Sequence, residues 1–405
     1  MKIRSITFFC NPLERGIEDH LDQINRMAEQ LRQNALSKGW ECQTIRLATT
    51  PFSQYTDANS VVDQIVHLER KVIERGLDYL SIGPARISSI STYQIIPEIL
   101  SATRNVFTSA LIAHPYKGIS TSILNATASI IHQAASISPD GFANLRFCAM
   151  SHVQPFTPFF PAAYSYGQGL SFAFAIEGAD AAVRSFSNSD NIQDARENLR
   201  SSLNAAGEQL SIIAQETVKS FSVPFRGIDF SLAPFPQDSA SIAKAMELLI
   251  GQPLGCAGSL GSASVLVDIL DQGGWQRAGF NGLMMPVLED SILAERSADD
   301  RFSVKDLIMY AAVCGTGLDT VPLPGDISIG QIEAILFDIA AQSLRLKKAL
   351  TARLMPIPGL HFKDDTQFDF EFFKNGRVMV MPTAPLTGLY KNSDWIKISS
   401  RYTLS

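Results

Sequence analysis

Hydrophobic residues recur along the chain in two alternating patterns. Short runs rich in β-branched and aromatic residues predict strands, and longer stretches with an apolar residue at every third or fourth position predict helices. The two patterns alternate almost from one end of the chain to the other. The predicted strands cover residues 3–10, 43–48, 78–83, 106–113, 145–150, 170–176, 225–231, 280–287, 319–323, 352–357 and 377–381.

The helical stretches carry recognisable start and stop signals. The apolar residues from Leu21 to Ala35 follow the helical period, and Gly39 comes after them as a stop. The other clear helices are predicted at residues 60–75 and 193–221, and at a stretch that opens with Ser328 and Gln331 in the spacing of a capping box.

Alternation of strands and helices predicts parallel strands joined by crossover helices, so the expected fold class is α/β. The chain has no internal repeat and no low-complexity linker. About ten strands without a linker favour one large barrel or sheet over two separate lobes, and we expect a single domain over residues 1–405. The aromatic and proline-rich stretch 154–161 marks a possible sub-boundary near residues 151–170.

Composition narrows the class of protein. Of the 405 residues, 46% are hydrophobic and 18% are charged, which indicates a protein with a large core. The net charge of −6 removes the broad attraction that drives non-specific binding to nucleic acids and anionic membranes. The apolar runs fall far short of a membrane span, and the first is broken at Asn11 and Pro12 before a signal peptide could form. We expect a cytoplasmic protein with a small-molecule ligand, and its apolar fraction is compatible with homo-oligomers.

Cysteine and histidine spacing gives no metal or disulfide signature. The five cysteines are widely spaced, and the six histidines contain no His-Glu-x-x-His pattern. We therefore predict no zinc site. The adjacent acids Glu289 and Asp290 end a predicted strand and could offer oxygen ligands to Mg²⁺, but a helix that starts at Glu289 would explain them equally well.

Strand ends supply the candidate catalytic and binding residues. Asp229 and Ser231 lie two apart on a strand, so their side chains share a face, and Asp229 could act as a general base with Ser231 as a hydrogen-bond donor. The alternative is that Asp229 satisfies backbone amides. Cys314 lies in a glycine-rich turn, where it is either an accessible thiol or an inert residue at a helix end.

Other candidates come from loops. Gly258 and Ser259 precede a helical stretch and could present amides to an anion, or form an ordinary serine-capped turn. His114 and His152 follow predicted strands, and Lys117 could supply charge for an anionic substrate. A solvated loop explains Lys117 equally well.

Several of these segments resemble a known family. Residues 228–234, 312–326 and 351–359 match in order and spacing across 218–385, and more faintly across 80–178. The chain is similar to the uncharacterised prokaryotic family called domain of unknown function seven-eleven. The resemblance implies a ten-strand α/β barrel like that of glycyl radical enzymes and ribonucleotide reductases. The family has no established activity, so the resemblance implies no roles, although Asp229, Ser231, Cys314 and Asp319 occupy matching positions.

The chain also departs from these patterns. Glycyl radical enzymes need Arg-Val-x-Gly, and here Val380 stands where the glycine is required, so the motif argues against a glycyl radical enzyme. Typical relatives show Phe-His-Gly-x-Gly-Glu after their equivalent of Phe156, whereas this chain has no His or Glu in 157–169.

Two functional hypotheses follow. The first is an enzyme that acts on a small polar or anionic metabolite by acid/base chemistry, with Asp229 as the base and possible help from Glu289, His114 or Cys314. The second is a binding or scaffold protein that keeps the barrel without the family's site residues. In that case, aromatic side chains of the 156–164 stretch would fill the barrel mouth.

Overall fold

A computed structural model describes residues 1–13, 16–55, 61–379 and 382–401. Strands and helices alternate along most of the chain, so the protein is α/β. The strands of the main sheet are β1 (Lys2–Cys10), β2 (Cys42–Thr49), β3 (Tyr79–Ala85), β4 (Val106–Leu111), β6 (Phe147–Ser151), β7 (Ser171–Glu177), β8 (Phe225–Ala233), β9 (Gly317–Pro324) and β10 (Leu350–Ile357). Each corresponds to a strand predicted from the sequence.

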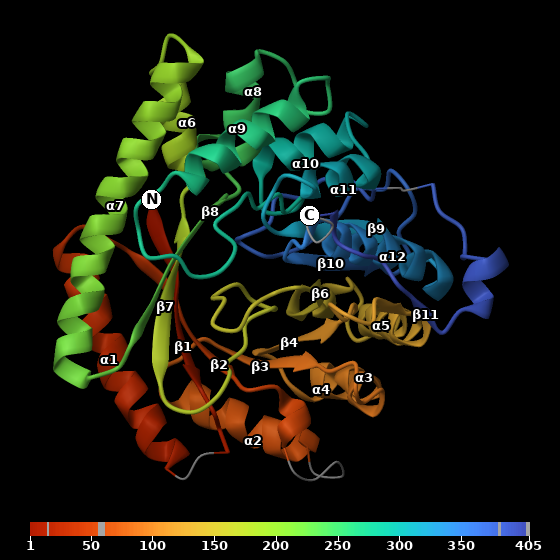
Figure 1. The fold of residues 1–405 in the computed structure, drawn as a ribbon, viewed down its shortest axis with the longest axis horizontal. Coiled ribbons are helices and arrows are strands. Elements are labelled where there is room, and N and C mark those ends of the chain that lie inside the picture. Colours follow the sequence, from red (N-terminus) through yellow and green to blue (C-terminus); the bar gives the residue numbers. More distant parts are fainter. Residues whose placement is uncertain (14–15, 56–60, 380–381, 402–405) are drawn as a thin grey trace.

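The helices lie around the outside of a curved sheet (Figure 1). They are α1 (Ile17–Ser37), α2 (Val61–Glu74), α3 (Ser91–Gln94), α4 (Ile96–Ala102), α5 (Thr121–Ala135), α6 (Ala179–Ser187), α7 (Ile192–Phe221), α8 (Ile242–Ile250), α9 (Ser259–Asp271), α10 (Ser291–Ala298), α11 (Val304–Ala311) and α12 (Ile329–Leu346). The predicted helices over 21–35 and 193–221 are confirmed as α1 and α7. The Ser328–Gln331 capping box opens α12.

Short elements complete the fold. The 3₁₀ turns are η1 (Phe52–Gln54), η2 (Phe142–Arg146), η3 (Asp238–Ala240) and η4 (Gly388–Asn392). A separate two-stranded ladder joins β5 (Ile119–Ser120) to β11 (Trp395–Ile396), and the sequence patterns missed both strands.

Strand directions divide the sheet into two parallel groups. The order is β8-β7-β1-β2-β3-β4-β6-β10-β9. Five neighbouring strands, β1, β2, β3, β4 and β6, run the same way. The pairs β7–β8 and β9–β10 are parallel internally but antiparallel to the central group. The expectation of parallel pairing alone is therefore wrong at two junctions.

The described residues do not form a closed ten-strand barrel. The predicted strand at 280–287 is not a regular strand, because Asn281 has a positive φ and Pro286 lacks a backbone N–H. The surrounding segment still makes one parallel bridge to each sheet edge, Arg277 to Ile228 in β8 and Pro286 to Asp319 in β9. The predicted strand at 377–381 is reduced to a single bridge at Arg377, and residues 380–381 lie outside the described part.

Side chains on the two faces of the sheet enter different cores. Ile6 and Phe8 of β1 pack outward with Leu21 of α1, whereas Phe9 packs inward with Phe160. The concave face is filled by the aromatic, proline-rich segment 153–164, whose Phe159 and Ala162 contact residues of β6 and β8. The stretch considered as a sub-boundary is therefore packed inside the curve of the sheet.

The adjacent acids Glu289 and Asp290 have separate tasks. Asp290 is buried and caps two helices at once. Its Oδ1 accepts hydrogen bonds from the backbone N–H groups of Ile292 and Leu293 at the start of α10, both at 3.0 Å. Its Oδ2 accepts one from the N–H of Ile242 in α8 at 2.7 Å. A helix start thus accounts for Asp290, but not for Glu289, which turns toward the concave face.

We expect Asp290→Ala to lower the free energy of unfolding by about 3–5 kcal/mol, because it strips an acceptor from several buried donors. Urea unfolding measures the change. Asn191→Ala removes the exposed cap of α7 and serves as the matched control, with an expected loss of about 1 kcal/mol. Equal losses in the two variants would contradict the double-cap role.

Candidate functional site

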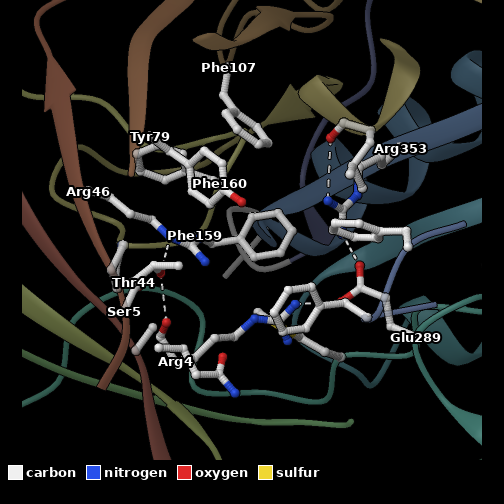
Figure 2. A pocket seen from close by; sticks show the side chains of 17 residues that line it. Arg4, Ser5, Thr44, Arg46, Tyr79, Phe107, Phe159, Phe160, Glu289 and Arg353 are labelled. Carbon is white, nitrogen blue, oxygen red and sulfur yellow. Dashed lines mark hydrogen bonds and ion pairs between the residues drawn. The ribbon is translucent and has the colours of Figure 1, made fainter. Parts of the chain in front are cut away.

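A pocket of about 90 Å³ opens on the concave side of the sheet (Figure 2). This volume is several times the roughly 10–15 Å³ that a single water molecule needs. Its polar lining comes from β1, β2, β10 and the turn before α10, and its apolar lining comes from β4 and the segments 158–160 and 370–372. The charged and phenolic side chains of the lining are those of Arg4, Arg46, Tyr79, Glu289 and Arg353. We call this site the arginine pocket.

Arg46 reaches the pocket because side chains alternate along β2. Ile45 and Leu47 pack outward in the main core, so Arg46 points inward. Its guanidinium lies 5.6 Å from the ring centroid of Tyr79 and 5.2 Å from that of Phe160. Such contacts with aromatic faces stabilise a cation electrostatically.

The charge of Arg46 is otherwise weakly compensated. Its Nε donates a hydrogen bond to Thr44 Oγ1 at 2.8 Å, but within the described ranges it forms no ion pair with a carboxylate. Burial lowers the pKa of Arg46 to about 10, and the neighbouring Arg4 cation lowers it as well. The side chain therefore stays charged at neutral pH and can attract an anion.

Arg4 reaches the pocket through a bulge. The register of β1 against β7 shifts between Ile3 and Ser5, so both Arg4 and Ser5 line the pocket. Arg4 Nη2 donates to Glu289 Oε2 at 2.5 Å. Its Nη1 is buried and has no hydrogen-bond partner among the described residues. An unpaired buried donor is costly, which makes Nη1 a ready partner for a ligand oxygen.

Arg353 is held by two carboxylates. Its Nε donates to Asp319 Oδ1 at 2.5 Å, and its Nη2 donates to Glu289 Oε1 at 2.9 Å. These three side chains are each at most 6% exposed, so the ion pairs are fully buried. Burial raises the pKa of Glu289, but the cations Arg4 and Arg353 lower it by more, and the net pKa lies below its ordinary value. Glu289 is thus ionised at neutral pH.

The structure therefore brings two predicted site residues together, Glu289 and Asp319. Glu289 lines the arginine pocket. Asp319 is not part of the lining but forms an ion pair with Arg353, which is. Within the described residues, no group of three or more histidine, cysteine or acidic side chains is arranged to hold a metal ion.

The side chains of Asp229 and Ser231 lie outside the arginine pocket, where they accept hydrogen bonds from backbone N–H groups. Asp229 accepts hydrogen bonds from the N–H groups of Phe280 at 2.9 Å and Asn281 at 3.0 Å, and from the hydroxyl of Ser231. Burial raises the pKa of Asp229, against the opposing effect of these bonds. Gly279, at φ 75°, permits the approach, since a Cβ there would lie 2.1 Å from Asp229 Oδ2. Together they fix the irregular segment that bridges the sheet edges.

Contacts within the protein also hold Cys314, His152 and Ser259, which lie outside the arginine pocket. Cys314 is 1% exposed, and burial raises the pKa of its thiol, which disfavours the reactive thiolate. His152 Nδ1 lies 3.0 Å from Ser343 Oγ of α12, and burial lowers the pKa of its imidazole. Gly258 is the N-cap of α9, and the Ser259 hydroxyl donates to the carbonyl of Cys256 at 2.8 Å.

His114 and Lys117 lie in a tight turn before β5. His114 exchanges backbone hydrogen bonds with Gly118, and its Nδ1 accepts from the N–H of Lys117 at 3.2 Å. Lys117 Nζ lies 5.7 Å from the ring centroid of Trp395 in β11. Neither side chain lines the arginine pocket. The catalytic and binding roles of residues outside the pocket stay predictions.

The sequence patterns missed Arg4, Arg46 and Arg353. One signal was present, because all three are charged residues inside predicted strands. A charge within a buried strand is expensive and usually has a specific partner or task. The bulge at Arg4, however, places it on the face opposite to the one that simple alternation from Ile6 predicts.

Comparison with known proteins places the chain among relatives. Residues 1–374 match the model of the family described as Uncharacterised ACR (DUF711). This chain belongs to that family. The matched range contains the whole lining of the arginine pocket, from Arg4 to Phe372. The resemblance inferred from the sequence is confirmed at the level of the family.

Family members from distant organisms align over most of their length. A UPF0210 protein of Pyrobaculum islandicum is 28% identical over 94% of this chain and 90% of its own. One from Pyrobaculum arsenaticum is 29% identical over 89% and 86%, and one from Clostridium perfringens is 24% identical over 91% and 88%. In the described part of the chain, no helix combines the length and apolar character needed to cross a membrane.

We expect Asp229→Asn to lower the free energy of unfolding by about 2–4 kcal/mol, because an amide cannot accept all the hydrogen bonds that the carboxylate takes. Chemical denaturation measures this loss. Ligand affinity in the arginine pocket should change less than twofold, because Asp229 lies outside it. Unchanged stability with lost turnover would support the catalytic hypothesis for Asp229.

Proposed function

We propose that the protein binds a small anionic metabolite in the arginine pocket and acts on it by acid/base chemistry. The observation that carries the proposal is Arg46, a charged guanidinium held between aromatic rings without a carboxylate partner among the described residues. A guanidinium presents N–H groups in a fork that matches the oxygens of a carboxylate or phosphate. The unpaired Nη1 of Arg4 supplies a further donor.

Glu289 is the candidate base in this proposal. It is an acidic side chain in the pocket lining, and its lowered pKa keeps it ionised. Each of its oxygens accepts one hydrogen bond from an arginine, which leaves lone pairs for a proton from the bound metabolite. Arg4 and Arg353 would then hold Glu289 in position while Arg46 holds the ligand.

Binding without turnover is the second candidate. Phe159 and Phe160, two of the residues expected to fill the mouth of a non-catalytic barrel, do line the pocket. They reduce its volume without removing its charged lining. The same pocket could therefore hold a ligand that is sensed or carried rather than converted.

We also infer that the sheet follows the plan of the glycyl radical enzyme barrel without radical chemistry. Five strands run one way and four run the other, and the bridging segment 277–286 contacts both edges in a parallel sense. An irregular segment would then occupy the place of a tenth strand. The absence of the radical glycine motif from the sequence argues against the corresponding chemistry.

We expect Arg46→Gln to weaken binding of a small anion by about 10- to 100-fold, the usual range for a charged hydrogen-bonding partner. Calorimetric titration with acetate, and separately with inorganic phosphate, measures the effect. Arg226→Gln is the matched control, since Arg226 also stacks on an aromatic ring, that of Phe156, but lies outside the pocket lining. Equal binding by the two variants would refute the proposed site.

We expect Glu289→Gln to abolish proton transfer. Because the amide also leaves Arg4 and Arg353 short of a negative charge, circular dichroism and anion binding first establish that the variant is folded. Incubation with short 2-oxo carboxylates in D₂O, followed by mass spectrometry, detects exchange of a hydrogen on the carbon beside the ketone for deuterium, because the ketone stabilises the carbanion as an enolate when Glu289 removes that proton. The wild-type protein should add deuterium to its substrate, and the variant should lose at least 100-fold of that rate.

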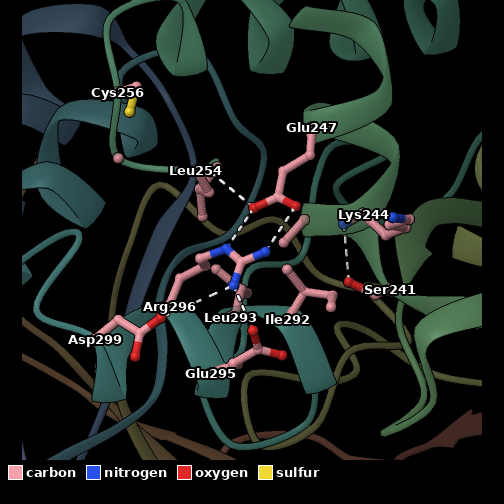
Figure 3. A network of polar contacts seen from close by, with 12 residues as sticks. Ser241, Lys244, Glu247, Leu254, Cys256, Ile292, Leu293, Glu295, Arg296 and Asp299 are labelled. Atoms are coloured by element: carbon pink, nitrogen blue, oxygen red, sulfur yellow. Dashed lines mark hydrogen bonds and ion pairs between the residues drawn. The ribbon is translucent and has the colours of Figure 1, made fainter. Parts of the chain in front are cut away.

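Glu247→Gln is the control for loss of a partly buried ion pair. Glu247 pairs through both oxygens with Arg296, at 2.7 and 3.1 Å, and joins α8 to α10 away from the pocket (Figure 3). This variant should keep the exchange rate of the wild type. Anion binding without exchange in any form of the protein would favour the second candidate.

A further inference from the structure

We infer that the ligand is a short-chain monocarboxylate, with its carboxylate on Arg46 and its apolar chain against the aromatic wall. This inference rests on the proposed function and narrows it to one chemical class. Two independent features of the pocket carry it: the ion pairing of the arginines, and the large apolar part of the lining.

The charge balance selects an anion with a single negative charge. Arg4, Arg46 and Arg353 bring three positive charges, and their ion-pair partners Glu289 and Asp319 bring two negative ones. The acid Glu177 also acts on Arg4, but burial raises the pKa of its carboxyl, and it accepts a hydrogen bond from Gln43. Among the described residues of the pocket, Arg46 is therefore the arginine without an ion-pair partner. A second negative charge on the ligand would be buried without a partner, and an unpaired buried charge is strongly disfavoured.

Arg353 does not compete for the ligand. Its Nε and Nη2 donate to carboxylates, and its Nη1 donates to the carbonyl of Leu145 at 3.5 Å. In the part of the chain that the structure describes, the unpaired guanidinium donors of the pocket belong to Arg4 and Arg46. The Nη groups of one guanidinium can hold both oxygens of one carboxylate, and Nη1 of Arg4 can add a bond to one of them.

The apolar wall of the pocket adjoins the arginines, since the Phe159 ring centroid lies 5.8 Å from the Arg353 guanidinium. It consists of carbon-rich side chains that offer no hydrogen-bonding group, namely Phe107, Leu145, Phe159, Met284, Phe370 and Phe372. A hydroxylated or phosphorylated tail would lose its hydration there without compensation. A hydrocarbon tail would instead gain from burial.

Packing and hydrogen bonds hold the apolar wall of the pocket in place. Phe370 and Phe372 belong to a segment whose neighbours Phe368 and Phe373 are buried in a core with Met355 of β10. The segment is tied back by Asn375, whose side-chain oxygen accepts from the N–H of Phe368 at 2.8 Å. A tail of a few carbon atoms suits the pocket volume of about 90 Å³.

The test is a calorimetric titration of the full chain with acetate, propionate, butyrate and pentanoate. Each added methylene should tighten binding by about three- to fourfold until the cavity is full. Succinate, which has the four carbons of butyrate but two charges, should bind at least tenfold more weakly than butyrate, and so should inorganic phosphate. Equal affinities along the series, or tighter binding of succinate or phosphate, would overturn the inference.

Two variants test whether the gain in affinity per added methylene comes from the apolar wall of the pocket. Phe370→Leu should reduce the advantage of pentanoate over acetate while leaving the affinity for acetate within twofold. Phe362→Leu, at a 44% exposed phenylalanine outside the arginine pocket, should leave the whole series unchanged. Acetate binding that depends on Arg46 without any gain along the series would defeat this inference alone, whereas no binding by any anion would defeat the proposed function as well.

Discussion

The buried ion pairs of Glu289 with Arg4 and Arg353 are the interaction on which the concave side of the molecule depends. Three guanidinium groups inside a sheet would be strongly unfavourable without carboxylate partners. Glu289 and Asp319 neutralise two of them and fix their orientations. The third, Arg46, is stabilised by aromatic faces instead. Because the surroundings have a low dielectric constant, this remaining charge acts more strongly on a ligand than it would on the surface.

The turn between Pro286 and α10 connects the pocket to the helices. Glu289 enters the ion-pair network, and the next residue, Asp290, caps both α8 and α10. On the other side of the turn, Pro286 and Val287 contact the edge strand β9 at Asp319. A single stretch of chain therefore positions an acidic side chain of the pocket relative to a sheet edge and two helix termini. Any shift of these helices would be transmitted to the arginines.

Local sequence signals predicted most of the architecture but little of the site. Strands such as β1 and β10 and helices such as α1 carry strong periodicities, because each has one face in the main core. The irregular segment at 280–287 was expected to be a strand, since it contains a continuous run of apolar residues. Its backbone is instead set by Asp229 and Ser231, a constraint that is distant in sequence.

The arginines escaped prediction for a related reason. Their roles depend on which strands become neighbours, and the bulge at Arg4 changes the face that its side chain occupies. Glu289 was found because an acid that ends a predicted strand is a general signal, and Asp319 because it matches the family pattern, whereas their common partner Arg353 carried neither signal. Asp229 has the same local signal as Glu289, yet long-range contacts give the two acids different surroundings.

The span of the pocket along the sequence has a consequence for folding. Its lining runs from Arg4 to Phe372, and β1 must pair with β7, about 170 residues away, before the concave face exists. Contacts of such high sequence separation form slowly, because long loops must close before the contacts stabilise them. The pocket is thus a property of the completed chain and not of any short fragment. A ligand that binds there recognises only the native state, so it would stabilise the whole molecule against global unfolding and would draw late folding species toward completion.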